Sequence, residues 1–158
     1  MAELKVPTVA LPAEILGTDG RRFVGRIFVP ATASRHTGSM RAEEWMDDPA
    51  SFFPFLADGT SSPVILNKRQ VLVLSVPFDA ERDAPGKEED EAGARRRVRV
   101  WCDEREFEGT IHIDMPENQS RVLDYLNRPG RFIGLWDGQR HLLLQRDRIT
   151  RVQENPEG

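Results

Sequence analysis

The feature that most constrains the fold of this chain is an internal repeat, in which two halves of the sequence correspond in order. Residues 23–29, which read FVGRIFV, match 107–113, which read FEGTIHI, in an aromatic residue, a glycine and the apolar positions that follow. Residues 41–49, RAEEWMDDP, match 121–129, RVLDYLNRP. Similarity that persists through successive elements is typical of a duplicated structural unit. We therefore predict two tandem units.

The correspondence continues toward the end of each half. It passes through an aromatic residue, an Asp-Gly turn and an apolar strand that ends in an amide and a basic residue: Phe52 with Phe132, 58–59 with 137–138, and 64–68 with 142–146. Periodicity and turn residues predict two strands, a short helix and further strands in each unit. The predicted fold class is mainly β with short helices, as two pseudo-symmetric small β units that are barrel-like or sandwich-like.

Strands are predicted where apolar residues alternate or form short runs between turns. In the first unit these are 13–16, 23–29, 53–56, 64–67 and 71–76, and in the second 98–102, 107–113, 132–136, 142–145 and 149–152. Short helices are predicted at 41–46 and 121–126, with Ser39 and Ser120 as N-caps. A proline follows each helix and prevents its extension.

The chain is expected to divide into two units and a connection: 1–78 is the first β-rich unit, 79–94 a flexible charged linker, 95–153 the second β-rich unit and 154–158 a tail. The linker contains no large apolar residue, so ordering it would bury little apolar surface. Units this small rarely form a stable core alone, which predicts that the two pack together. The loop at 30–38 has no counterpart in the second unit.

Composition narrows the classes of function. The 158 residues carry a net charge of -4, so the chain as a whole repels the phosphates of nucleic acids. A single cysteine, Cys102, excludes an intramolecular disulfide and fits a reducing compartment, which predicts a cytoplasmic protein. No apolar run is long enough to cross a bilayer, so we expect no membrane insertion.

The sequence contains no recognised catalytic or metal-binding motif. The histidines His36, His112 and His141 lack the close spacing that zinc ligands usually show. A nucleophile elbow, a P-loop and a dinucleotide-binding glycine pattern are all missing. We therefore expect that the protein is not an enzyme and that it needs no cofactor and no metal ion.

One candidate binding site follows from the repeat. Arg41 lies one helical turn before Trp45, and Arg121 lies one turn before Tyr125, so both units carry the same pair on a predicted helix. Arginine and large aromatic residues are frequent energetic anchors of protein interfaces. These four residues are the candidate partner-binding site. The sequence leaves open the alternative that each arginine only covers the ring or pairs with a neighbouring acid.

Two segments resemble known families. Arg95 and Arg99 stand before a predicted strand and resemble the R-x-x-x-R segment of PilZ domains, which helps to bind cyclic diguanylate. The D-x-S-x-x-G motif of PilZ domains would fall at 114–119, which reads DMPENQ and lacks the serine and the glycine. Residues 121–132 resemble the R-L-S-D-F-L-N signature of an uncharacterised small bacterial domain family, which the first unit matches more weakly. This resemblance implies a bacterial origin and a domain type, and no activity.

A protein-binding or regulatory adaptor is the leading interpretation, because a duplicated β unit offers two related surfaces and no reaction centre is recognisable. Its expected partner is an unidentified protein, and nucleic acid is not expected. The alternatives are a nucleic-acid binder of the Sm-like or SH3-like type, a nucleotide-sensing PilZ-like protein, and an enzyme with an unrecognised site. Salt-sensitive retention on nucleic acid would favour the first alternative.

Overall fold

A computed structural model describes residues 8–30, 42–77, 94–113 and 121–154. The fold is mainly β, as the sequence predicts. The first half contains β1 (Thr8–Gly17), β2 (Arg22–Pro30), α1 (Ala42–Asp47), β3 (Phe52–Ala57), β4 (Val64–Asn67), the 3₁₀ turn η1 (Lys68–Gln70) and β5 (Val71–Pro77). The second half contains β6 (Ala94–Cys102), β7 (Arg105–Ile113), α4 (Val122–Asn127), β8 (Phe132–Asp137), β9 (Arg140–Gln145), η3 (Arg146–Arg148) and β10 (Ile149–Glu154).

All strands belong to one antiparallel sheet with the order β10-β6-β7-β8-β9-β5-β1-β2-β3-β4. The two halves therefore have the same internal order, β5-β1-β2-β3-β4 in the first and β10-β6-β7-β8-β9 in the second. An irregularity in register also recurs, between Leu16 and Gly17 against β5 and between Ile149 and Arg151 against β6. The two halves are called unit one and unit two below.

The glycine shared by the two repeats has a structural reason. Gly25 on β2 and Gly109 on β7 lie where these strands come closest to β3 and β8. A Cβ atom at Gly109 would lie 2.5 Å from the carbonyl oxygen of Trp136, and one at Gly25 would lie closer still to that of Leu56. Because no side chain fits there, glycine is required for the strands to curl round and pair.

The hydrophobic cores of the two units share residues across their junction. The core of unit one, built around Ile15, Ile27 and Phe55, also contains Phe132 and Leu143 from unit two. The core of unit two contains three unit-one residues, Leu16, Leu72 and Val73. The units therefore pack together, and each completes the other's core.

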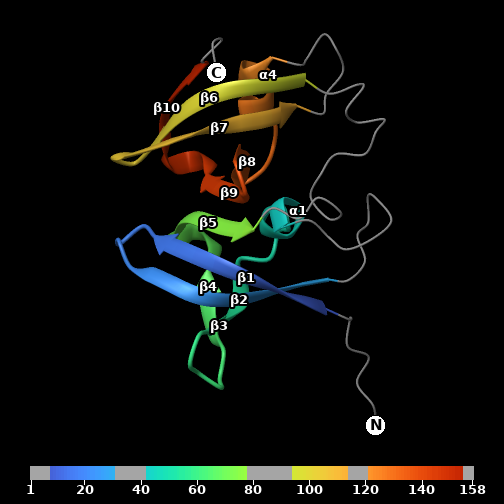
Figure 1. Ribbon diagram of the computed structural model, residues 1–158, viewed down its shortest axis with the longest axis vertical. Coiled ribbons are helices and arrows are strands. Elements are labelled where there is room, and N and C mark those ends of the chain that lie inside the picture. The colour runs from blue at the N-terminus through green and yellow to red at the C-terminus, as the bar shows by residue number, and fades with distance from the viewer. Residues whose placement is uncertain (1–7, 31–41, 78–93, 114–120, 155–158) are drawn as a thin grey trace.

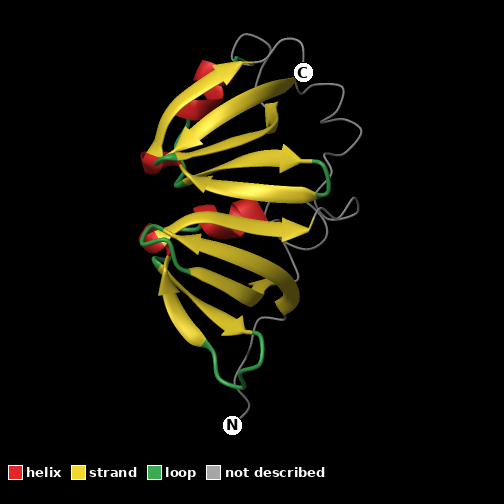
Figure 2. Cartoon of the chain, turned by 60° about the vertical axis from the view of Figure 1, so that its left-hand side comes forward, coloured by secondary structure: helices red, strands yellow, loops and turns green. Residues whose placement is uncertain are grey.

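The junction consists of a strand pair and a helix. Strand β5 pairs with β9, with Leu74 opposite Leu143 and Ser75 opposite Leu142. Helix α1 of unit one lies beside β8 of unit two. Figure 2 shows the two curled halves of the sheet stacked one on the other, with β5 and β9 in the middle. The opposite ends of the molecule carry β3 and β4 of unit one, and β10 and α4 of unit two.

The predicted strands are all present, most of them longer by one or more residues. Both helices begin and end one residue later than predicted. The predicted N-cap Ser120 is wrong, because Arg121 takes the N-cap position of α4 without a capping side-chain bond. Strand β6 begins at Ala94, inside the predicted linker. Ser39, the loop at 31–38 and residues 79–93 lie outside the described residues.

Candidate functional site

The structure describes three of the four predicted partner-binding residues, Trp45, Arg121 and Tyr125. Arg41 lies outside the described residues. Trp45 on α1 is half-buried, and its ring meets Phe53 edge-on with the centroids 5.1 Å apart. The amine of Lys68 lies 5.7 Å from the Trp45 ring centroid. Through these contacts Trp45 packs α1 against the core of unit one.

In unit two the aromatic ring is buried and a different arginine covers it. Tyr125 is 3 % exposed, and the guanidinium of Arg128 lies 4.4 Å from its ring centroid. Arg121 is exposed and pairs with Asp124 at 3.0 Å. For Arg121, the structure thus shows the pairing with a neighbouring acid that the sequence left open. Whether these residues bind a partner stays a prediction.

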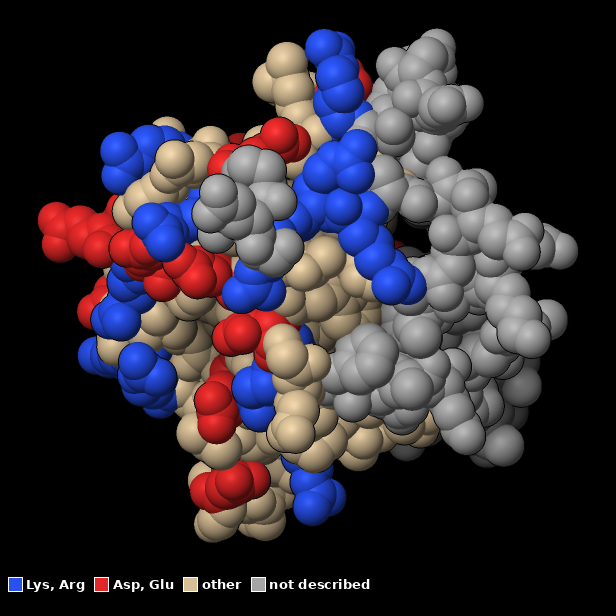
Figure 3. Space-filling view, turned by 45° about the horizontal axis from the view of Figure 1, so that its top comes forward, with Lys and Arg blue, Asp and Glu red and all other residues tan. Residues whose placement is uncertain are grey.

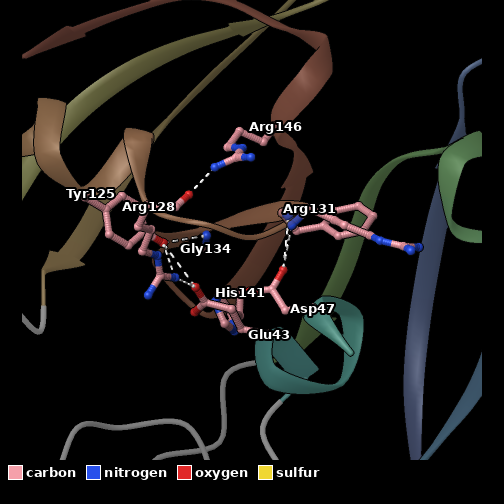
Figure 4. Close-up of polar contacts among 9 residues, drawn as sticks. Glu43, Asp47, Tyr125, Arg128, Arg131, Gly134, His141 and Arg146 are labelled. Atoms are coloured by element: carbon pink, nitrogen blue, oxygen red, sulfur yellow. Dashed lines mark hydrogen bonds and ion pairs between the residues drawn. The ribbon is translucent and has the colours of Figure 1, made fainter. Parts of the chain in front are cut away.

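A polar network that the sequence reasoning missed joins the two units at their junction (Figure 4). The Tyr125 hydroxyl donates to Glu43 Oε1 at 3.1 Å and accepts from the backbone N–H of Gly134 at 3.0 Å. Arg128 donates to the same Glu43 oxygen at 2.7 Å. Glu43 comes from α1 of unit one and its partners from unit two, so these bonds fix the helix of one unit against the sheet of the other.

A second carboxylate on the same helix reinforces this contact. Asp47 Oδ1 accepts hydrogen bonds from the backbone N–H groups of Arg131 and Phe132, each at 3.1 Å. Arg131 also donates from its guanidinium to the carbonyl oxygen of Pro49 at 3.1 Å. The last turn of α1 is thereby joined to the first residues of β8.

His141 completes the network from β9. Its ring is buried and stacks on Trp136 with the centroids 3.9 Å apart, and its Nε2 lies 3.9 Å from Glu43 Oε2. The imidazole therefore lies between an aromatic ring and a carboxylate. Its counterpart in the repeat of unit one is Pro63, so the network is a property of the junction and is not shared by the two units.

Burial shifts the pKa values of the ionisable side chains in this network. Burial raises the pKa of Glu43 above its usual value, against the opposing effect of the Arg128 charge. Burial also raises the pKa of Asp47, although its bonds from the backbone of Phe132 and Arg131 act in the opposite direction. Burial and the neighbouring Glu43 raise the pKa of the Tyr125 hydroxyl, which stays protonated as a donor. The shifts in these pKa values follow from the burial of the carboxyl and hydroxyl groups between the two units.

A basic residue caps the helix carbonyls in both units. The buried amine of Lys68 donates to the carbonyl oxygens of Trp45 and Asp48, at 3.0 and 3.1 Å, where α1 ends. Burial lowers the pKa of Lys68. In unit two Arg146 donates to the carbonyl oxygen of Arg128, just past α4. In the sequence, each matched strand ends in an amide residue followed by a basic residue, at 67–68 and 145–146. This shared pattern is what indicates that both units cap the helix in the same way.

A cleft of about 570 Å³ lies beside the strand junction, and both units line it. Its apolar surface comes mainly from Ile15, Leu16, Phe23, Val24, Val73, Phe107 and Leu142. Phe23 and Phe107 are the matching aromatic residues of the repeat, and both are partly exposed. The two matching aromatic residues therefore line the same cleft.

The rim of the cleft carries charges of both signs: Glu14, Arg22, Arg105, Glu106, Asp137 and Arg140. Arg140 is held in place by Ser75, to whose hydroxyl and carbonyl oxygens it donates at 2.5 and 3.1 Å. A cleft with an apolar floor and fixed polar groups at its edge is the usual form of a binding site for a ligand or peptide.

The other side chains considered as possible functional groups, Arg99 and Cys102, have structural surroundings that explain them. Arg99 pairs across the β6–β7 hairpin with Glu106 at 2.8 Å and Glu108 at 2.5 Å, so carboxylates already hold this PilZ-like arginine. Burial raises the pKa of the Cys102 thiol to about 12, which makes it a poor nucleophile. Within the described residues, no group of His, Cys, Asp and Glu is arranged to hold a metal ion.

Charges are largely intermixed on the face drawn in Figure 3, where acidic side chains stand among basic ones apart from one basic run. Among the described residues, neither helix has the length and apolar composition that crossing a bilayer requires.

Comparisons with protein-family models, with curated proteins and with solved structures found no match to this chain. The resemblance of 121–132 to a bacterial domain family stays a prediction.

Proposed function

We propose that the chain is a non-enzymatic adaptor that binds an extended segment of a partner protein in the cleft beside the junction. The observation that carries this proposal is the cleft itself, whose apolar surface combines Phe23 and Val24 of unit one with Phe107 of unit two. Phenylalanine and arginine are both enriched in protein interfaces relative to the rest of the surface. A duplicated unit gains here a site that neither copy would have alone.

The rim indicates the character of the partner segment. Three acidic and three basic residues surround the apolar floor, so a segment with an apolar side chain between residues of opposite charge would complement it. Because acidic and basic residues are equal in number here, the rim lacks the excess positive charge that attracts a phosphate backbone. The cleft therefore supports the adaptor interpretation over the nucleic-acid alternative.

Peptide display tests this proposal. Peptides selected from a random library on the wild-type protein would be measured for affinity against Val24→Lys, which places a charge in the cleft at an exposed position, and against Ile65→Lys, a control on β4 away from the cleft. We expect Val24→Lys to weaken binding at least about tenfold, or about 1.4 kcal/mol, and Ile65→Lys to leave it unchanged. Selected peptides that bind both variants as they bind the wild type would refute the site.

A further inference from the structure

We infer that this chain assembles head to tail with further copies of itself, through the two ends of the sheet that correspond to its internal junction. The junction joins one face of unit one, made by β5 and α1, to one face of unit two, made by β8 and β9. Unit two carries the counterpart of the first face in β10 and α4. Unit one carries the counterpart of the second in β3 and β4. Within the described chain both counterparts lie at the ends (Figure 1).

The pattern of exposed apolar side chains marks these two ends. Five large hydrophobic residues are exposed among those described: Val24, Phe52, Val64, Ile65 and Leu123. Three of them lie on β3 and β4, and Leu123 lies on α4. Only Val24 lies elsewhere, in the cleft. Exposed apolar patches of this kind mark interaction surfaces.

The repeat shows what these residues would do. Phe132 and Leu143 are the unit-two residues that enter the core of unit one. Pairing within β3–β4 and β8–β9 makes Phe52 the counterpart of Phe132, and Ile65 the counterpart of Leu143. Phe52 is 59 % exposed and Ile65 is 71 % exposed. The side chains that would enter the core of a neighbouring unit are thus present at the end of the molecule and exposed to solvent.

The internal register predicts the register between copies. In β5–β9, Leu74 lies opposite Leu143 and Ser75 opposite Leu142. Their counterparts at the ends place Val152 of one copy opposite Ile65 of the next, and Gln153 opposite Val64. Pro63 removes a backbone donor just beyond β4, so the ladder between copies is shorter than the internal one.

The helix at the open end suits an apolar contact. Leu123, 59 % exposed, stands where α1 has Glu43. At the junction Glu43 is surrounded by Tyr125, Arg128, Gly134 and His141. The counterparts of these residues in unit one are Trp45, Asp48, Pro54 and Pro63. Leu123 would therefore meet mainly apolar side chains, with Asp48 as the one charged residue.

A backbone-binding side chain is also retained at this end. Asn127 stands where α1 has Asp47, and its amide oxygen can accept hydrogen bonds from backbone N–H groups as the carboxylate of Asp47 does. The end of unit two thus combines an apolar contact with an acceptor for the neighbouring strand.

A contact between unlike faces builds a closed ring or an open chain of copies, whereas a contact between like faces stops at a dimer. Lysine substitutions at the two opposite ends test this directly by light scattering coupled to size exclusion. Ile65→Lys damages only the β4 end, and Leu123→Lys damages only the α4 end. Both positions are exposed, so in dilute solution, where the wild type is dissociated, thermal unfolding of each variant should match that of the wild type.

We expect the wild type to have a mass at least twice the 18.0 kDa of one chain, and each variant alone to be a monomer. An equimolar mixture of the variants retains one intact contact between unlike chains, so it should form a one-to-one dimer and nothing larger. Val24→Lys is the matched control and should assemble as the wild type does, although it would lose any ligand of the cleft. Failure of assembly and failure of the proposed function are therefore distinguishable.

Disulfide trapping tests the register independently. A chain with Val64→Cys and a chain with Gln153→Cys, mixed under oxidising conditions, should cross-link to each other, while each chain alone should not. A wild-type protein that stays monomeric at its highest attainable concentration would overturn the inference. So would a variant mixture that remains monomeric, or cross-linking within either chain population alone.

Discussion

The junction inside the chain and the two ends of the molecule are built from corresponding elements but from different side chains. At the junction, Glu43, Arg128 and His141 form a polar network beside the paired strands. At the ends the counterparts are Leu123, Asp48 and Pro63. One backbone arrangement thus carries a polar contact in one place and an apolar surface in the other. The difference favours correct pairing, because an end that carries Leu123 fits poorly against the arginine and histidine of unit two.

Shortening a buried side chain in the β5–β9 strand pair should have the largest effect on stability. Leu143→Ala removes a fully buried side chain from the core of unit one, which should lower the free energy of unfolding by about 2–5 kcal/mol. Its counterpart substitution, Ile65→Ala, should change it by no more than about 0.5 kcal/mol in dilute solution, because Ile65 is exposed there. Urea denaturation measures both. Equal losses of unfolding free energy would show that β9 and β4 have similar surroundings, and would contradict the comparison.

Breaking the junction network should have the next largest effect. Arg128→Met removes the cation that pairs with Glu43 and leaves a carboxylate in a mostly buried position, which should cost about 1–3 kcal/mol of unfolding free energy. Arg121→Met removes an exposed ion pair on the same helix and should leave the thermal midpoint unchanged. A larger effect from Arg121 would mean that the network does not hold the units together.

The two junction carboxyls should give stability a pH dependence. Burial raises the pKa values of Glu43 and Asp47 above their ordinary values of 4.5 and 3.8, so the folded chain binds more protons than the unfolded chain just above about pH 4. Their contribution to stability therefore falls as pH rises through this window. The lowered pKa of Asp124 acts below 3.8 and does not overlap with it.

Urea midpoints measured from about pH 4 to neutrality test this sign. The double variant Glu43→Gln, Asp47→Asn should show a shallower decline than the wild type, because it lacks both titrating groups. A variant with the same slope as the wild type would place the pH dependence elsewhere in the chain.

The elements of the fold were largely predictable from the sequence. Alternating apolar residues, Asp-Gly turns and prolines act locally, so they located the strands and both short helices to within a few residues. The shared glycine at Gly25 and Gly109 pointed to a recurrent structure, although only the close approach of β3 and β8 gives its reason.

The junction could not be predicted in the same way. Glu43 and Tyr125 are 82 residues apart in the chain, and the counterpart of Glu43 in the repeat is an apolar leucine, so comparison of the halves gave no signal. The pairing of β5 with β9 follows from how two curled units meet, which local patterns do not encode. By the same limit, the sequence paired Tyr125 with Arg121, whereas in the structure the guanidinium of Arg128 lies over the Tyr125 ring.

Amide hydrogen exchange at low and high protein concentration tests the central comparison most directly. Amides of β5 and β9 should be protected at every concentration, because these strands pair within one chain. Amides on the outer edges of β4 and β10 should exchange rapidly in dilute solution and become protected as concentration rises. Exchange at β4 and β10 that does not change with concentration, or rapid exchange throughout β5 and β9, would contradict the account.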